Sequence, residues 1–304
     1  MRTLVLGAGG QVGRELLHAL AGQGEVVAAT RTGAPVDGAR GARADLADPA
    51  SVIALLEAER PERVVNAAAY TAVDRAEGEP ALAQVVNAEA PGEIARWCAG
   101  QGVPLVHYST DYVFDGQGSR PYRVDDPTAP LGVYGRTKLA GERAVRAAGG
   151  RHLIFRTAWV YAAHGHNFLR TMLRLGAERD ALRVVSDQVG TPTPAGLIAD
   201  VTARALAVEG AASGTWHLTA AGDTSWHGFA EAIFEGAAAR GLLSRVPRVE
   251  AIPTSEYPTP ARRPAYSCLD TSTLERDFGL QLPHWRDGVA GVLNELARAG
   301  DRAA

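Results

Sequence analysis

A tyrosine and a lysine stand four positions apart, at Tyr134 and Lys138. On a helix this spacing places the phenol and the ammonium on one face. A free tyrosine has a pKa of about 10 and exchanges protons poorly at neutral pH. A nearby ammonium favours the phenolate and lowers that pKa, so the pair could move a proton to or from a substrate. The alternative is an ordinary surface tyrosine and lysine at a chance spacing.

A hydroxyl-bearing residue precedes this pair. Thr110 ends the apolar run VPLVHYST and is followed by Asp111. If the run is a strand, Thr110 lies at its carboxyl end, where it could donate a hydrogen bond to a substrate carbonyl and polarise it. The competing interpretation is a threonine that only caps the turn after the strand.

A glycine-rich turn lies near the start of the chain, in the segment GAGGQVG. It has glycines at Gly7, Gly10 and Gly13, between an apolar run and a helical pattern. The first glycine permits a sharp turn, the second lets a pyrophosphate approach the backbone, and the third lets helix and strand pack closely. The helix N-terminus then offers free N–H groups to the phosphates. This context predicts a dinucleotide site.

The residue after the second predicted strand indicates which dinucleotide binds. NAD-preferring enzymes usually have an acid there, but this chain has Arg31 and no acid before Asp37. A guanidinium can pair with the 2′-phosphate of NADPH. We therefore predict NADPH as the cofactor, with NADH as the alternative. Asp45 and Leu46 could hold the adenine edge, or Asp45 could be only a turn residue.

Small residues follow the third predicted strand, at Ala67, Ala68 and Ala69. They would let a dinucleotide lie close to the backbone. Asn87, after a helical run of apolar residues, could bind backbone or cofactor. Both this residue and the segment 66–70 could equally be structural.

The elements that must position these residues alternate along the first half of the chain. Apolar runs predict strands at 4–6, 25–30, 64–66, 104–109 and 153–157, and helical patterns cover 11–21, 49–58, 80–99 and 134–148. Asp48 is the expected N-cap of the second helix, with Pro49 at its first position. The alternation predicts a Rossmann-type α/β fold: a doubly wound parallel sheet with ligands at the carboxyl ends of its strands.

The second half alternates less regularly. Residues 188–195 and the proline-rich 253–264 read as loops, and 285–299 reads as a final helix. We expect an NAD(P)-binding Rossmann domain over residues 1–160, to which later segments return. A smaller C-terminal α/β lobe over 161–304 is expected to bind mainly the substrate.

Composition excludes several classes of protein. Of 304 residues, 46% are hydrophobic and 21% charged, and the net charge is −3. This balance gives no indication of a nucleic-acid or membrane-surface partner. Cys98 and Cys268 are too few for a disulfide framework and show no zinc spacing. The N-terminal apolar run is too short for a signal peptide or a membrane span, so we expect a cytoplasmic protein.

Five segments occur together in order: GAGGQVG, NAAAYTAVDRAE, HYSTDYVFDG, YGRTKLAGE and FRTAWVY. Together they resemble the extended short-chain dehydrogenase/reductase superfamily. The segments HNFLRTML, SDQVGTPT, TWHL and YPTPARRP narrow the resemblance to the dTDP-4-dehydrorhamnose reductase family, over residues 1 to about 296. This resemblance implies NAD(P)H-dependent reduction of the C4 keto group of dTDP-4-dehydro-L-rhamnose to dTDP-L-rhamnose.

The resemblance also implies roles for individual residues. Tyr134 would be the proton donor, Lys138 its support, and Thr110 the group that holds the carbonyl. Matching cofactor positions are Gln11, Val12, Asp45, Leu46, Ala67, Ala68, Ala69, Tyr108, Tyr134 and Lys138. The substrate positions would be Thr110, Asp111, Trp159, Asn167 and Arg263, the last suited to a pyrophosphate.

For some members of the family, the resemblance implies a homodimer that magnesium bridges through glutamates. Glu15 and Glu295 fit two of those positions, but the third falls near Gly196. Loss of one carboxylate weakens a site for a hard cation. We therefore predict no metal, consider a homodimer without the metal bridge, and interpret His164 and His166 as loop residues.

Two other functions fit the same pattern. The chain could act on a different nucleotide-linked 4-keto sugar, as a reductase or an epimerase. It could also be a non-catalytic subunit of the same fold, similar to the regulatory subunit of methionine adenosyltransferase. A pure binding role would not require Thr110, Tyr134 and Lys138 together.

Overall fold

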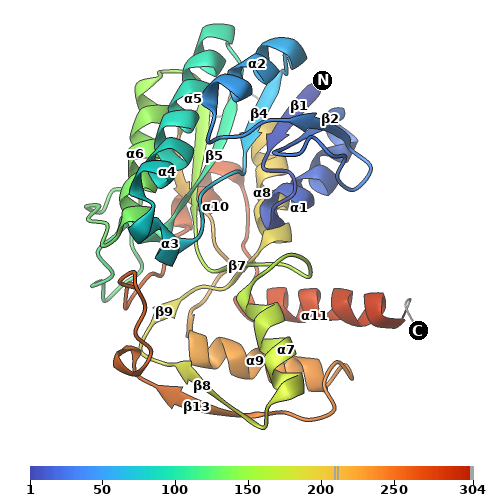
Figure 1. Ribbon diagram of the computed structural model, residues 1–304, viewed down its shortest axis with the longest axis vertical. Coiled ribbons are helices and arrows are strands. Elements are labelled where there is room, and N and C mark those ends of the chain that lie inside the picture. Colours follow the sequence, from blue (N-terminus) through green and yellow to red (C-terminus); the bar gives the residue numbers. More distant parts are fainter. Residues whose placement is uncertain (209, 211, 302–304) are drawn as a thin grey trace.

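The five apolar runs predicted as strands all lie in one parallel sheet of seven strands in the computed structural model, which describes residues 1–301 except 209 and 211 (Figure 1). The strands are β1 (Arg2–Leu6), β2 (Glu25–Thr30), β3 (Arg40–Arg43), β4 (Arg63–Asn66), β5 (Leu105–Thr110), β6 (His152–Thr157) and β11 (Gly214–His217). Their order is β11-β6-β5-β4-β1-β2-β3. The two edge strands of this sheet, β3 and β11, were not predicted. The chain reverses direction across the sheet at β1, so a ligand crevice is expected at the carboxyl ends of β1 and β4.

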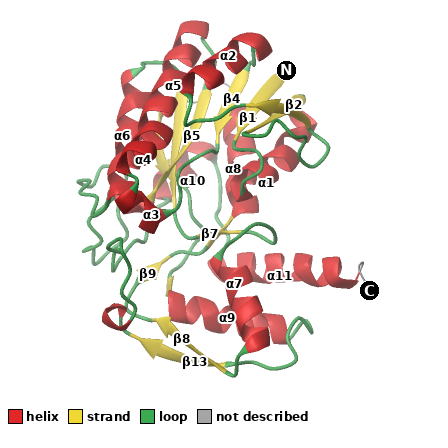
Figure 2. Cartoon of the chain, in the orientation of Figure 1, coloured by secondary structure: helices red, strands yellow, loops and turns green. Residues whose placement is uncertain are grey.

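Helices cover both faces of this sheet (Figure 2). Alternate residues of β1 explain why: Val5 packs in a core with α1 (Gln11–Leu20), α8 (Ala195–Ala207) and α10 (Ser272–Phe278), whereas Leu4 and Leu6 pack in the opposite core. The helices of that second layer are α2 (Pro49–Glu59), α5 (Ala90–Gln101) and α6 (Val133–Ala147). Burial on both faces accounts for the nearly continuous apolar runs of the strands. The predicted Rossmann-type fold is confirmed.

Two local expectations differ from the structure. The helix predicted over 80–99 is interrupted: α4 (Pro80–Gln84) is followed by a π-helical turn (Val85–Glu89) before α5 begins. This turn contains the buried Asn87, and such turns often mark functional sites. Pro49 does begin α2, but Asp48 makes no side-chain capping bond.

The remaining short elements lie between these helices and strands. They are α3 (Val73–Gly78) and the 3₁₀ turns η1 (Ala21–Gln23), η3 (Asp111–Val113) and η4 (Thr254–Glu256). Among the helices of the described residues, none has both the length and the apolarity that a bilayer span requires.

A second lobe lies beyond the carboxyl ends of the strands (Figure 1). Its core joins α7 (Phe168–Glu178), α9 (Trp226–Ala238) and α11 (Trp285–Asp301) with a parallel pair, β8 (Ala181–Val185) and β13 (Arg248–Ile252). Two short ladders connect it to the sheet domain: β7 (Val160–Tyr161) with β10 (Thr193–Pro194), and β9 (Val189–Gly190) with β12 (Thr224–Ser225). The segment 188–195, expected to be a loop, therefore contains β9 and β10.

Later segments return from the second lobe to the sheet. Strand β11 pairs with β6, and α8 packs against α1. We propose the domain division accordingly: residues 1–160 with these returning segments form the Rossmann domain, and 161–304 form mainly the substrate lobe.

Candidate active site

In the turn after β1, the structure shows why glycine stands at positions 7, 10 and 13. Gly7 has φ +76°, which side chains rarely adopt, and a Cβ there would lie 2.6 Å from Cα of Ala68. A Cβ on Gly13 would lie 2.7 Å from Cα of Ala8 and overlap the carbonyl of Gly7. Gly10 is the N-cap of α1 and offers no side chain to the first N–H groups. These groups stay available to an anion.

One cavity of about 1040 Å³ opens between the glycine turn, the carboxyl ends of the strands and the second lobe. Most of the residues predicted to hold a cofactor line it: Gly7, Gly10, Gln11, Val12, Arg31, Asp45, Leu46, Ala67, Ala68, Ala69, Tyr108, Tyr134 and Lys138. The predicted substrate residues Thr110, Asp111 and Trp159 line the same cavity. A cavity of this size is at the upper end of the range for small-molecule and cofactor sites.

The cavity also has walls that sequence reasoning missed. Thr71, Leu82, Val86 and Tyr112 line it. Tyr112 packs edge-on against Tyr134, with ring centroids 5.5 Å apart. The only signal in the sequence was position, because Thr71 and Tyr112 follow β4 and β5.

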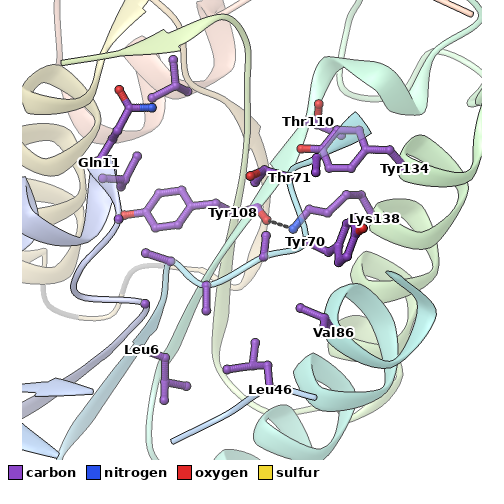
Figure 3. Close-up of a pocket in the computed structure, with 18 of the residues that line it drawn as sticks. Leu6, Gln11, Leu46, Tyr70, Thr71, Val86, Tyr108, Thr110, Tyr134 and Lys138 are labelled. Atoms are coloured by element: carbon purple, nitrogen blue, oxygen red, sulfur yellow. Dashed lines mark hydrogen bonds between the residues drawn. The ribbon is translucent and has the colours of Figure 1, made fainter. Parts of the chain in front are cut away.

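Tyr134, Lys138 and Thr110 converge on this cavity from two elements (Figure 3). Tyr134 and Lys138 lie one turn apart in α6, and Thr110 is the last residue of β5. Nζ of Lys138 donates a 2.6 Å hydrogen bond to the carbonyl oxygen of Tyr108. The hydroxyl of Thr110 donates to Oδ1 of Asp111 at 2.9 Å and accepts from the N–H of Tyr112 at 3.2 Å. Thr110 therefore does cap the following turn and also faces the cavity.

The electrostatics of the pair differ from the expectation. Burial raises the pKa of Tyr134 above its usual value, which the neighbouring Thr110 hydroxyl only partly offsets. Burial also lowers the pKa of Lys138 to about 8, against the charge of Glu142, which raises it. The predicted lowering of the Tyr134 pKa by Lys138 is wrong in this structure, because desolvation dominates. A phenol that keeps its proton at neutral pH is in the state from which a proton can be donated.

Asp111 is an acceptor beside this group. It is 2% exposed, and its Oδ2 is buried without a hydrogen-bond partner. Burial raises the pKa of Asp111 to about 6, although the hydrogen bond from Thr110 lowers it. A buried carboxylate oxygen without a donor can accept a hydroxyl of a polar ligand.

Asn167, Arg263 and Gly13 do not line the cavity. Asn167 caps α7 by accepting from the N–H of Arg170, and its Nδ2 donates to Oε1 of Gln11 at 2.8 Å. Arg263 pairs with Oδ2 of Asp74 at 2.7 Å. Both side chains therefore join the second lobe to the sheet domain. Their predicted substrate contacts stay predictions.

Asn87 has a structural role. Its side chain accepts from the N–H of Tyr70 at 2.8 Å and donates to the carbonyl of Tyr70 at 3.1 Å and to Oγ1 of Thr137 at 3.2 Å. It thereby holds the segment after β4 against α6.

The glutamate considered for a metal has another partner. Oε1 of Glu15 lies 2.7 Å from Nε2 of His164. A Cβ on Gly196 would be 3.7 Å from Oε2 of Glu15, so the position that would need a third carboxylate is adjacent but has no side chain. The residues that the structure describes contain no cluster of three or more His, Cys, Asp or Glu side chains placed to hold a metal ion.

The parallel sheet, the glycine turn and the convergence of Thr110, Tyr134 and Lys138 on one cavity define an oxidoreductase of the extended short-chain dehydrogenase/reductase class. Comparison of the sequence with known proteins identifies the family within this class. The family model of the RmlD substrate binding domain matches residues 1–298. A dTDP-4-dehydrorhamnose reductase of Burkholderia thailandensis is 50% identical over 307 residues, covering 97% of this chain and 99% of the relative. The chain belongs to the dTDP-4-dehydrorhamnose reductase family.

Solved structures agree with this assignment. A dTDP-4-dehydrorhamnose reductase from Clostridium acetobutylicum superposes with a TM-score of 0.88 at 36% identity, over 97% of this chain and 99% of that chain. A second, from Bacillus anthracis in complex with NADP, has a TM-score of 0.88 at 32% identity and the same coverage.

Proposed function

We propose that this chain catalyses the NAD(P)H-dependent reduction of the C4 keto group of dTDP-4-dehydro-L-rhamnose to dTDP-L-rhamnose. The observation that carries the proposal is the single cavity in which a phosphate-binding turn, a tyrosine–lysine pair and a strand-end threonine meet. Membership of a family whose named relatives are dTDP-4-dehydrorhamnose reductases supports the choice of substrate.

The residues present fit a nicotinamide dinucleotide. No side chain caps the N-terminus of α1 at Gly10, so its first N–H groups can bind a phosphate. The small side chains of Ala67 to Ala69 line the cavity and let a ligand approach the backbone closely. When bound, the nicotinamide supplies the hydride that reduces C4 of the sugar. Arg31 directly follows β2 and lines the cavity. Its guanidinium can pair with a 2′-phosphate, so we propose NADPH as the preferred cofactor and NADH as the alternative.

The chain's own residues account for the proton. When substrate binds, the Thr110 hydroxyl exchanges its bond to Oδ1 of Asp111 for one to the keto oxygen and polarises the carbonyl. Tyr134, which burial keeps protonated, gives its proton to that oxygen as it becomes a hydroxyl. The ammonium of Lys138 then stabilises the tyrosinate left behind. Asp111 accepts a sugar hydroxyl at its unpaired Oδ2, and the indole of Trp159 forms a wall for the sugar.

A turnover assay tests the proposal. NADPH and NADH oxidation is measured with dTDP-4-dehydro-L-rhamnose and with other dTDP-linked 4-keto sugars. We expect the highest kcat/KM for NADPH with dTDP-4-dehydro-L-rhamnose. Higher activity on a different 4-keto sugar would reassign the substrate. No turnover with any keto sugar, together with intact binding of NADPH, would support a regulatory subunit instead.

The remaining assignments follow from this role. Cys98 and Cys268 are free and buried, which fits a reducing compartment, and we propose that the enzyme acts in the cytoplasm. We propose that it needs no nucleic-acid or membrane partner, and that any homodimer forms without a glutamate-bridged metal, since Gly196 supplies no ligand. Sedimentation with magnesium and with EDTA should then give the same mass.

A further inference from the structure

Two tryptophans from distant segments stack on each other at the boundary between the lobes. The ring centroids of Trp159 and Trp226 are 3.6 Å apart and their planes differ by 6°. Trp159 lies between β6 and β7 and lines the cavity, whereas Trp226 is the first residue of α9 and is not part of the lining. Trp226 also packs on Phe168, with centroids 4.7 Å apart, and so is anchored in the core of the second lobe.

The backbone of Trp159 has a conformation that a tryptophan rarely adopts. Its φ is +48°, in the left-handed region that favours glycine. Such a conformation persists only where the surrounding structure imposes it. The carbonyl of Trp159 accepts from the N–H of Thr193 at 3.2 Å, which holds the main chain. The stack on Trp226 holds the side chain.

A glycine borders the same indole. A Cβ added at Gly190 would lie 2.5 Å from Cε2 and 2.7 Å from Nε1 of Trp159. Real Cβ atoms do not approach other atoms so closely, so only glycine at this position in β9 leaves room for the ring. The absence of a side chain at Gly190 makes room for the edge of the indole, and the aromatic face of Trp226 packs against its plane.

The geometry points to Trp226 and Gly190 as positioning residues that determine how the enzyme recognises the sugar part of its substrate. They fix the Trp159 indole as a rigid wall, and an aromatic face of this kind suits the apolar face of a deoxyhexose. A rigid wall binds better than a mobile one, because no rotamer freedom is lost on binding. This inference rests on the proposed function, in which Trp159 contacts the sugar.

The test separates sugar binding from nucleotide binding. Calorimetry measures the affinities of wild type, Trp226→Leu, Trp226→Phe and Gly190→Ala for dTDP-L-rhamnose, for dTDP and for NADPH. Circular dichroism monitors the exciton couplet of the stacked indoles. Trp216→Phe is the control, since Trp216 lies in β11 and packs on Phe155 and Phe278, away from the cavity.

We expect Trp226→Leu to lose the couplet and to bind dTDP-L-rhamnose about tenfold more weakly. Its affinities for dTDP and NADPH should be unchanged, and in turnover its KM should rise more than its kcat falls. Trp226→Phe should retain most of the sugar affinity. Gly190→Ala should displace the indole and reproduce the loss with Trp226 intact, which covers the case of a Trp226→Leu variant that does not fold.

Three outcomes would overturn the inference. One is loss of the couplet with unchanged affinity for dTDP-L-rhamnose, and the second is equal weakening of dTDP and dTDP-L-rhamnose. The third is a wild type that binds dTDP no more weakly than dTDP-L-rhamnose, so that the sugar adds nothing. A wild type that binds dTDP-L-rhamnose but does not turn over 4-keto sugars would refute the proposed function alone.

Discussion

The ammonium of Lys138 is tied to the main chain of Tyr108 by a 2.6 Å hydrogen bond, the dashed line in Figure 3. The phenol of the same Tyr108 is held from the other side of the sheet, 2.7 Å from Oγ1 of Thr202 in α8. The carboxyl-terminal part of strand β5 is therefore clamped between α6 and α8. Thr110, two residues further on, is held in place relative to Tyr134 by this clamp.

The charge of Lys138 should set the alkaline limit of activity. Burial lowers its pKa to about 8, so the ammonium is present below that pH and is lost as the pH rises through it. If the charge is needed, kcat/KM is constant below pH 8 and falls about tenfold per unit above it. The pKa of Tyr134 is raised, so its ionisation cannot cause this fall. A rate that stays constant to pH 10 would contradict the role given to Lys138.

Removal of the Tyr134 hydroxyl should abolish turnover but not binding. We expect Tyr134→Phe to lower kcat about 10²- to 10⁴-fold, because general acid catalysis contributes an effect of this size. NADPH affinity, measured by fluorescence titration, should stay within about twofold. Tyr257→Phe is a matched control, since Tyr257 is 59% exposed and does not line the cavity. Comparable loss in both variants would argue against a specific proton donor.

Arg31 should discriminate between the two dinucleotides. The Arg31→Ala variant loses the cation that we propose pairs with the 2′-phosphate, and we expect KM for NADPH to rise about 10- to 100-fold. KM for NADH, which lacks that phosphate, should change little. Arg143→Ala, at an exposed position of α6, serves as the control. Parallel changes for NADPH and NADH would show that Arg31 does not contact the 2′-phosphate.

The buried ion pair of Glu142 and Arg156 should stabilise the folded protein. Glu142 lies one turn after Lys138, and its two carboxylate oxygens accept bonds of 2.8 Å from Nε and Nη2 of Arg156. Burial alone would raise the pKa of Glu142, but Arg156 outweighs it and lowers that pKa. Breaking one partner of a buried pair is costly, so Glu142→Gln should lower the free energy of unfolding by about 3 kcal/mol.

The same variant should shift the pH profile. Glu142 raises the pKa of Lys138, so its neutralisation should move the alkaline fall in activity to lower pH. Glu93→Gln is the control for stability, because Glu93 forms an exposed pair with Arg96 worth less than about 1 kcal/mol. An unchanged pH profile in a folded Glu142→Gln enzyme would refute the electrostatic link.

The third glycine of the turn should be needed for folding rather than for contact with the cofactor. Gly13 does not line the cavity, and a Cβ there would overlap the backbone of Gly7 and Ala8. We expect Gly13→Ala to lower the free energy of unfolding by about 1–3 kcal/mol, measured by denaturant titration. Gly22→Ala, where a Cβ meets nothing within 4 Å, should change it by less than about 0.5 kcal/mol. Equal effects would contradict the packing argument.

Order along the chain was enough to predict the five inner strands of the sheet and the end of the sheet at which the cavity opens. The strands around 4–6, 64–66 and 104–109 were recognisable because each is buried on both faces and reads as an apolar run. Ligand-binding residues often follow such strands directly, so Thr110 and Ala67 could be expected at the cavity, which they line, without coordinates. The second lobe was harder to predict, because its strands β9 and β10 are each only two residues long. So short a strand leaves no periodicity to detect.

Local patterns in the sequence are therefore sufficient for the Rossmann-type sheet, the phosphate-binding turn, and the spacing of Tyr134 and Lys138. Folding alone brought Trp226 onto Trp159, set Asn167 against Gln11, and desolvated the half-buried Tyr134 and the buried Lys138 enough to raise one pKa and lower the other. The reason is physical: periodicity and glycine spacing act within one element. Desolvation and stacking depend on atoms that meet only when segments far apart in the chain pack together.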